Sequence, residues 1–251
     1  MASEEKEGRL KGIKAVFFDL GGTLVDFDPS PNWGRTAERL ARAAHERLGA
    51  QAPPLEQFLP TFLNAVRGPE VRQLELQGVA IPWAERLRRG LAAFGFPLPA
   101  HLPAALTHMI SEELTPTARV EADVLPALAA LHRAGLRLGI ISNTPWDTRG
   151  HYLEEMLRRE GLLDYLPVRL FSGNAGVRKP SPEIFAAALE ACGVAPKAAA
   201  FVGDDLHADI MGALNAGWRA FWRRPPEVKE HAPPGCRTIT SIREILPSLL
   251  P

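Results

Sequence analysis

The stretch FFDLGGTLVD, residues 17–26, decides how the rest of the chain is interpreted. It overlaps a short apolar run, 13–18, and places Asp19 directly after that run. A continuous apolar run of this length is typical of a strand buried on both faces of a sheet. Gly21 and Gly22 let backbone N–H groups approach an anion closely, although a strand-ending turn with an aspartate has the same pattern. The stretch therefore predicts a buried strand with a carboxylate at its tip.

Four further apolar runs alternate with helical patterns, at 136–142, 168–171, 198–202 and 219–222. Apolar residues repeat at helical spacing over 124–131 and 184–189, and Pro182 and Gly193 suit the start and the end of the second helix. This alternation predicts an α/β fold with a doubly wound, Rossmann-like parallel sheet. Ligands of such folds bind beyond the carboxyl ends of the strands.

Residues 27–117 contain helical patterns only. Amphipathic stripes cover 33–48, 55–66, 83–94 and 102–114, which predicts a four-helix-bundle cap with Trp33 and Trp83 in its core. Because the bundle interrupts the α/β pattern after the first strand, we expect an inserted domain. The expected domains are a core formed by 1–26 and 118–251 and a cap formed by 27–117.

Composition excludes several classes of protein. Lys+Arg and Asp+Glu both number 29, so the charge gives no reason to expect nucleic acid or an anionic membrane as a partner. The sequence shows no apolar stretch of membrane-spanning length and no secretory signal at its start. Two cysteines cannot build a disulfide framework. We therefore expect a cytoplasmic protein; its oligomeric state cannot be read from the sequence.

Polar residues also follow other predicted strands, at the same edge of the sheet as Asp19. Ser142 and Asn143 follow the second run, and Lys179 precedes a helix. Asp204, Asp205 and Asp209 follow the fourth run. Ser142 could hold a ligand or cap the following helix, and Asp205 is read as a helix N-cap or a solvated neighbour. We read His207 as a second-shell or structural residue.

In these residues the sequence resembles the haloacid dehalogenase superfamily, which consists mostly of phosphatases. Four motifs occur in the family's order: FFDLGGTLVD, IISNT, RKPSPEIF and FVGDDLHADI. They span essentially the whole predicted core, and the helical insert matches the family's cap placed after the first motif. The resemblance implies hydrolysis of a small phosphorylated metabolite with Mg²⁺ as cofactor.

The resemblance also implies a role for each matching residue. Asp19 would be the nucleophile and a magnesium ligand, with the Gly21 carbonyl and Asp204 as further ligands. Ser142 and Lys179 would hold the phosphoryl oxygens, helped by backbone N–H groups near Leu20, Gly21 and Asn143. Asp209 would orient either a metal-bound water or Lys179. These roles agree with phosphoryl transfer, which requires positioning of the reacting groups and neutralisation of the phosphate charge. Attack by Asp19 would pass through an aspartyl phosphate.

One position departs from the family pattern. Family phosphatases usually carry an aspartate, the general acid, two residues after the nucleophile, where this chain has Gly21. The substrate could have a leaving group that needs no acid, or another group, from the cap or at Asp26 or Asp28, could serve as the acid. Alternatively, the chemistry could differ, or the site could be a weakened or non-catalytic metal–phosphate binder. Dehalogenase chemistry is disfavoured because Asp204 is present. Schiff-base phosphonate chemistry is disfavoured because 24–118 contains no lysine.

Overall fold

The computed structural model describes residues 9–224 and 228–250. Six strands form one sheet in the order β5-β4-β1-β6-β7-β8, and every neighbouring pair is parallel. The strands are β1 (Ala15–Phe18), β4 (Arg137–Ser142), β5 (Val168–Phe171), β6 (Ala199–Gly203), β7 (Arg219–Arg223) and β8 (Cys236–Ile239). The prediction of a doubly wound parallel sheet is confirmed.

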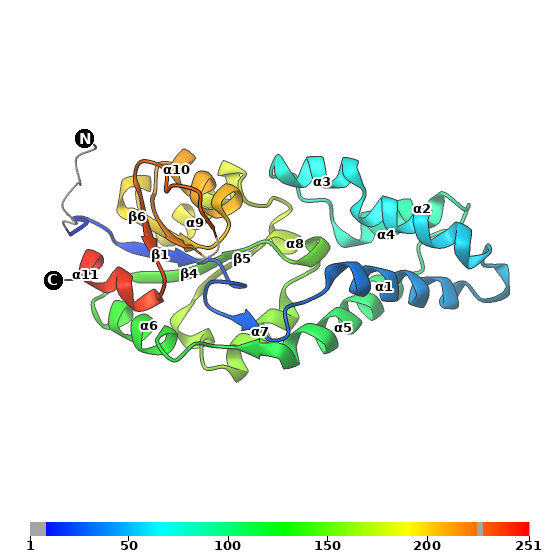
Figure 1. The fold of residues 1–251 in the computed structure, drawn as a ribbon, viewed down its shortest axis with the longest axis horizontal. Helices are drawn as coiled ribbons and strands as arrows, with labels where there is room; N and C mark the ends of the chain where they lie inside the picture. The colour runs from blue at the N-terminus through cyan, green and yellow to red at the C-terminus, as the bar shows by residue number, and fades with distance from the viewer. Residues whose placement is uncertain (1–8, 225–227, 251) are drawn as a thin grey trace.

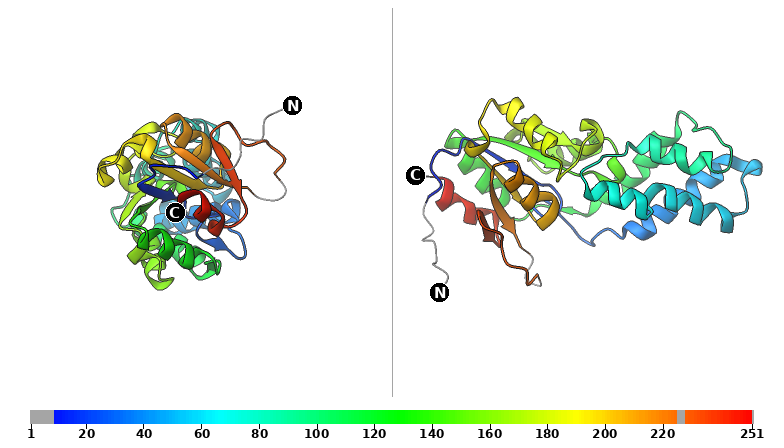
Figure 2. Two further views of the ribbon diagram at one scale, coloured as in Figure 1. Left: turned by 90° about the vertical axis from the view of Figure 1, so that its left-hand side faces the viewer. Right: turned by 90° about the horizontal axis from the view of Figure 1, so that it is seen from above.

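Helices cover both faces of this sheet, because successive side chains of a strand point to opposite faces. Val16 and Phe18 pack in the same apolar cluster as α6 (Val124–Arg133) and α7 (His151–Arg159). Ala15 and Phe17 pack in a second cluster with α9 (Pro182–Cys192) and α10 (Gly212–Asn215). The first of these layers is completed by α11 (Leu246–Leu249). Figures 1 and 2 show the sheet between these layers.

The segment 27–117 lies to one side of the sheet and gives the molecule its long axis (Figure 1). All of its residues are described, and they form five α-helices rather than the four helices expected. The helices are α1 (Trp33–Leu48), α2 (Leu55–Arg67), α3 (Pro69–Leu76), α4 (Trp83–Ala92) and α5 (Leu102–Leu114). The additional helix, α3, buries only Val71 and has no apolar stripe, so its pattern is not recognisable in the sequence.

A short antiparallel pair of strands joins this segment to the sheet domain. Its members are β2 (Asp26–Phe27) and β3 (Ala118–Arg119). Strands of two residues are too short to show a period of alternation, so the sequence did not predict them. The division into a core and a cap stays a prediction, and the β2–β3 pair lies at both of its expected junctions.

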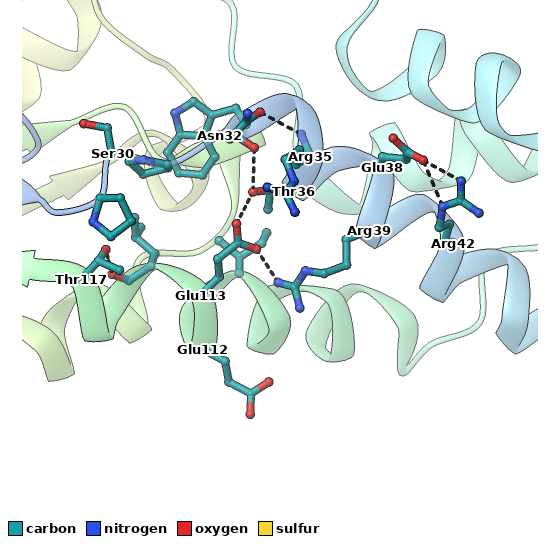
Figure 3. Close-up of a pocket in the computed structure, with 15 residues that line it drawn as sticks. Ser30, Asn32, Arg35, Thr36, Glu38, Arg39, Arg42, Glu112, Glu113 and Thr117 are labelled. Carbon is teal, nitrogen blue, oxygen red and sulfur yellow. Dashed lines mark hydrogen bonds and ion pairs between the residues drawn. The ribbon is translucent and has the colours of Figure 1, made fainter.

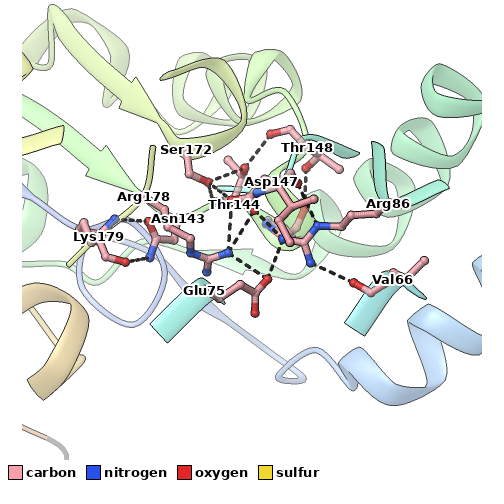
Figure 4. A network of polar contacts seen from close by, with 12 residues as sticks. Val66, Glu75, Arg86, Asn143, Thr144, Asp147, Thr148, Ser172, Arg178 and Lys179 are labelled. Carbon is pink, nitrogen blue, oxygen red and sulfur yellow. Dashed lines mark hydrogen bonds and ion pairs between the residues drawn. The ribbon is translucent and has the colours of Figure 1, made fainter. Parts of the chain in front are cut away.

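A buried polar network connects the helical segment to the rest (Figure 4). Arg86 of α4 is fully buried, and its Nη2 lies 2.5 Å from Asp147 and 2.7 Å from Glu75 of α3. Arg178 contacts the same two carboxylates at 3.2 and 3.0 Å. Ser172, the first residue of α8 (Ser172–Ala175), donates a 2.7 Å hydrogen bond to Asp147. Two arginines and two acids thus balance in charge across this contact.

Candidate active site

Asp19 lies at the carboxyl tip of β1, in the middle of the sheet. Its N–H donates to the carbonyl of Val202 on β6 at 2.9 Å, which fixes the backbone at the end of the strand. The side chain is nearly buried, and its Oδ1 accepts a 2.5 Å hydrogen bond from Nζ of Lys179. The other carboxylate oxygen accepts no hydrogen bond from a described residue. One oxygen of Asp19 is therefore neutralised, and the other is available to a ligand.

The loop after Asp19 leaves donors free for an anion. The carbonyl of Leu20 accepts from Leu24 and Val25 at 2.9 Å, which closes a tight turn. Gly22 has a φ of +77°, a conformation that glycine adopts without strain. The backbone N–H groups of Leu20 and Gly21 form no hydrogen bond within the described chain. They are therefore free to donate to a ligand.

Three carboxylates gather beside this loop. Candidate ligand oxygens of Asp19, Asp204 and Asp209 all lie within 4.8 Å of one another. Asp209 comes from the helical turn after β6, and its Oδ2 accepts from the N–H groups of Asp204 and Asp205 at 3.1 and 3.0 Å. Thr23, which is fully buried, donates to Asp204 at 3.5 Å. These bonds hold the cluster in place without a ligand.

Burial and mutual repulsion dominate the electrostatics of the cluster. Burial, strengthened by the Asp19 carboxylate, raises the pKa of Asp204 to about 7. Burial also raises the pKa of Asp209 to about 8, against the attraction of Lys179. Burial alone would lower the pKa of Lys179, but Asp19 and Asp209 outweigh it and raise this pKa. The ammonium therefore stays charged, and the cluster favours an additional positive charge.

The donor set fits a hard divalent cation. Carboxylate oxygens are the ligands that Mg²⁺ prefers in proteins, together with water. A Cβ built on Gly22 would lie 2.4 Å from Oδ2 of Asp204, so only glycine lets the loop approach this acid. Asp209 belongs to the cluster although the sequence assigned it an orienting role. The residues present are compatible with Mg²⁺.

Lys179 is held from three sides. The side chain of Asn143 brackets its backbone, because Asn143 Oδ1 accepts from the Lys179 N–H at 2.9 Å and Asn143 Nδ2 donates to the Lys179 carbonyl at 3.0 Å. The Lys179 ammonium contacts Asp19 and lies 2.6 Å from Asp209 Oδ1. Of the two roles considered for Asp209, the geometry shows contact with the lysine.

Ser142 is buried at the end of β4 and forms no side-chain hydrogen bond with a described residue. The alternative that it caps the following helix is wrong, because the hydroxyl reaches no backbone N–H there. The backbone N–H of Asn143 is likewise unpaired within the described chain. Both groups follow β4, which neighbours β1. Five predicted residues, namely Asp19, Lys179, Asp204, Asp209 and Asn143, are brought together by direct contacts.

Gly21 occupies the position of the missing general acid, and its backbone conformation does not require glycine. Its φ lies outside the left-handed region, and a Cβ built there would meet the Phe27 ring at 3.3 Å. Asp26, one of the alternative acids, lies 3.5 Å from Arg223 and hydrogen-bonds to Glu121. Burial is the main cause that raises the pKa of Glu121. Asp26 is thus engaged at the β2–β3 junction.

Asp205 and His207 have structural contacts. Asp205 is the N-cap of the turn after β6, and its Oδ1 accepts from His207 and Ala208 at 2.8 and 2.7 Å. Nε2 of His207 lies 2.9 Å from the carbonyl of Leu76, at the end of α3. The N-cap interpretation of Asp205 is confirmed, and His207 connects the acidic turn to the helical segment.

A cleft of about 420 Å³ runs from Lys179 and Asn143 to the helical segment. Trp146 of the sheet domain and Trp33 of α1 both line it, with their rings in an edge contact at 5.6 Å. Trp33 is 38% exposed, so its expected place in the bundle core is wrong. Trp83 is buried as expected, although it stacks on Trp146 of the sheet domain, 5.9 Å away.

A separate groove of about 810 Å³ lies between α1 and α5 (Figure 3). Asn32 caps α1 there by accepting from the N–H of Arg35 at 3.0 Å. Glu113 accepts from Thr36 and pairs with Arg39 at 2.6 Å. Glu113 is thus already paired, and the groove contains none of the predicted site residues.

Sequence reasoning missed Thr23, Asp147 and Arg178 as parts of the site and its surroundings. Thr23 and Arg178 both stand inside the motifs quoted above, next to residues that were assigned roles. Asp147 gave no signal, because its partners Arg86 and Arg178 lie 61 and 31 residues away. The family motifs could have identified the first two residues, and only the structure identifies the third.

The comparisons with known proteins agree with this geometry. The family model described as "Hydrolase: haloacid dehalogenase-like hydrolase" matches residues 13–217. The chain belongs to this family of haloacid dehalogenase-like hydrolases. It is therefore a hydrolase, and the resemblance in the four motifs is confirmed at the level of the family.

Relatives of this haloacid dehalogenase-like hydrolase include phosphatases. The pyrimidine 5'-nucleotidase YjjG of Escherichia coli is 32% identical over 82% of this chain and 84% of its own length. A phosphoserine phosphatase of Thermus thermophilus is 42% identical, but over only 38% of this chain and 36% of its own length. The structure of a HAD phosphatase from Thermococcus onnurineus covers 93% of this chain and 96% of its own, with 24% identity and a TM-score of 0.59, which shows a shared fold.

Among the described residues, no helix is long and apolar enough to cross a membrane.

Proposed function

We propose that this hydrolase is a magnesium-dependent phosphatase that acts on a small phosphorylated metabolite. The observation that carries the proposal is the Asp19 carboxylate, paired with Lys179 at 2.5 Å and clustered with Asp204 and Asp209 at the carboxyl ends of β1 and β6. Phosphoryl transfer requires a positioned nucleophile and neutralisation of the phosphate charge. The cleft of about 420 Å³ suits a small substrate, and the relatives named above are phosphatases of small molecules.

The chain's own groups supply most of the chemistry. Lys179, the Ser142 hydroxyl and the free N–H groups of Leu20, Gly21 and Asn143 bind the phosphoryl oxygens. The free oxygen of Asp19 attacks phosphorus, the bond to the leaving oxygen breaks, and an aspartyl phosphate forms. Water then attacks this phosphorus and releases phosphate and the Asp19 carboxylate.

Asp19, Asp204 and the Gly21 carbonyl would hold a magnesium ion, with Asp209 beside them. The bound ion would neutralise negative charge and let the anionic Asp19 approach an anionic phosphate. Because Gly21 has no proton to give, the leaving group takes its proton from solvent or leaves as an anion. We therefore expect the fastest turnover with good leaving groups, such as acyl and aryl phosphates.

The test is hydrolysis of p-nitrophenyl phosphate and acetyl phosphate with Mg²⁺ by the wild type and by Asp19→Asn. We expect phosphate release by the wild type, a loss of at least about 10³-fold in the variant, and loss of activity when EDTA removes the metal. The Asn side chain has nearly the same shape, so folding should be preserved. Equal phosphate release by the two proteins would reject the proposal.

A second candidate is a metal–phosphate-binding protein with little or no turnover. Gly21 favours it, because general acid–base catalysis contributes about 10²–10⁴-fold and no described acid replaces the missing one at that position. Calorimetric titration with Mg²⁺ and tungstate would show binding in both cases. A broad panel of phosphorylated metabolites separates them, since one well-hydrolysed substrate rejects the binding-only candidate.

A further inference from the structure

The cleft that begins at Lys179 and Asn143 carries cations without acidic partners at its end on the helical segment. Arg67, the last residue of α2, and Arg72, in the first turn of α3, both line the cleft that also contains Lys179 and Asn143. Within the described chain, Arg67 bonds only the Trp33 carbonyl, at 3.3 Å, and the Arg72 guanidinium has no partner. Both side chains are exposed.

Most of the other charged residues that line the cleft have a partner of opposite charge. Glu75 is shared between Arg86 and Arg178, at 2.7 and 3.0 Å, and Lys179 faces Asp19. Asp205 accepts hydrogen bonds only from backbone N–H groups and has no cationic partner among the described residues. Two arginines against this one acid leave the cleft wall with a net positive charge, which can bind an anion.

The position of these arginines relative to the nucleophile is fixed. The end of α3 is attached to the sheet domain by the bond between His207 and the Leu76 carbonyl. The Arg178 N–H donates to the Gly78 carbonyl at 3.2 Å, one residue before Lys179. The Arg67 guanidinium donates to the backbone carbonyl of Trp33, one of the two tryptophans that line the cleft. The helical segment thus holds Arg67 and Arg72 in the wall of the cleft that also contains Lys179.

We infer that the substrate is a phosphate monoester with a second anionic group, a carboxylate or another phosphate, which Arg67 and Arg72 bind. This inference rests on the proposed function, because it places the phosphoryl group at Asp19. Guanidinium groups bind carboxylates and phosphates through two parallel N–H donors, which makes them suited to this task. Trp33 and Trp146 form the apolar wall between the two charged ends.

The experiment compares two phosphonates that the enzyme does not hydrolyse, in excess Mg²⁺. Phosphonoacetate carries a second anion, and methylphosphonate does not. We expect wild type to bind phosphonoacetate at least about tenfold more tightly, and Arg67→Gln and Arg72→Gln to remove most of that preference while leaving methylphosphonate binding unchanged. Arg88→Gln is the matched control, because Arg88 is an exposed α4 arginine that pairs with Glu85 outside this cleft. It should keep the preference.

The same variants are tested for turnover of phosphoglycolate against ethyl phosphate. Arg67→Gln and Arg72→Gln should raise KM for phosphoglycolate at least about tenfold and leave both constants for ethyl phosphate unchanged. Equal affinity of wild type for the two phosphonates, or a preference that survives in both variants, would overturn the inference. A phosphonoacetate preference in a protein that does not hydrolyse p-nitrophenyl phosphate or acetyl phosphate either would reject the phosphatase and keep the anion site, so the two proposals fail separately.

Discussion

At the scale of single residues, the two glycines after Asp19 have different requirements. Gly22 combines a positive φ with a close approach to Asp204, and a Cβ there would lie 2.4 Å from the carboxylate. Gly21 has neither constraint, since its only close neighbour would be the Phe27 ring. We therefore expect Gly21 to tolerate substitution and Gly22 not to tolerate it.

Gly22→Ala should weaken metal binding strongly. The methyl group would displace Asp204, and the positive φ adds strain of about 1–3 kcal/mol. We expect Mg²⁺ to raise the melting temperature of the wild type, as a ligand of the folded state must, and to raise that of the variant far less. Gly21→Ala is the matched control and should retain the wild-type shift. An equal response of both variants would contradict the described loop.

Gly21→Asp should supply the missing proton donor. Its carbonyl stays available to the metal, and the Phe27 ring has to yield only by a few tenths of an ångström. Hydrolysis of alkyl phosphates, whose leaving groups need protonation, should rise about 10²-fold, while hydrolysis of acetyl phosphate should change far less. Gly21→Ala adds the Cβ without the acid and should give no gain. A folded, Mg²⁺-binding Gly21→Asp enzyme without a selective gain would show that proton supply does not limit the reaction.

At the scale of secondary structure, the sequence predicted the elements that have a regular apolar pattern, or a proline or glycine at their ends. The five apolar runs became β1, β4, β5, β6 and β7, and Pro182 and Gly193 start and end α9 as expected. β8 was missed because its first three residues are not buried. The Asp147 turn could not be predicted, because Trp146 and Asp147 have positive φ without being glycine. Long-range contacts, not local propensity, hold them there.

The buried pair between Arg86 and Asp147 should dominate the stability of the contact between α4 and the sheet domain. Arg86→Met would leave Asp147 buried with one arginine instead of two, and breaking a buried pair costs about 3–5 kcal/mol. Arg88→Met on the same helix removes an exposed pair with Glu85 and should lower the stability far less, because water screens exposed ion pairs. Urea unfolding of both variants provides the comparison, and similar losses would contradict the assigned role of Arg86.

Asp123, before α6, gives a pH-dependent prediction. Burial acts to raise its pKa, but hydrogen bonds from Ser241 and the Arg243 N–H outweigh burial and lower it below 3.8. A lowered pKa in the folded state stabilises the protein above the unfolded value and loses this effect as the pH falls through the folded value. Asp123→Asn should therefore be less stable at pH 7, by under about 1 kcal/mol. The difference should begin to shrink as the pH falls below 3.8 and should vanish below the lowered pKa of the folded state. A difference that persists there would contradict this account.

At the scale of the whole molecule, one apolar cluster extends from the sheet into the helical segment. Val16 of β1, Phe58 of α2, Leu87 of α4 and Trp146 belong to the same buried set. Together with the polar network around Asp147, this cluster joins the helical segment to the sheet domain through both apolar and polar contacts.

We therefore expect one cooperative unfolding transition. Far-UV circular dichroism, to which the helical segment contributes strongly, and tryptophan fluorescence should give coincident melting curves. Asp147→Asn should lower the melting temperature and begin to separate the two curves, because it removes the carboxylate that contacts both arginines. Clearly separate transitions in the wild type would show that the helical segment unfolds independently.

The β2–β3 pair has a consequence for how such a molecule could arise and diversify. Asp26 faces Arg119 and Phe27 faces Ala118, so the chain leaves and rejoins the sheet domain at adjacent points. An inserted segment of any length can be accommodated there without altering the path of a single sheet strand. The helical segment is in this sense exchangeable: recombination could replace it while Asp19, Lys179 and the acidic cluster keep their places. Asp147 would then lose Arg86, and His207 would lose the Leu76 carbonyl, until the new segment supplied partners for them. Positions 147 and 207 should therefore record each such exchange.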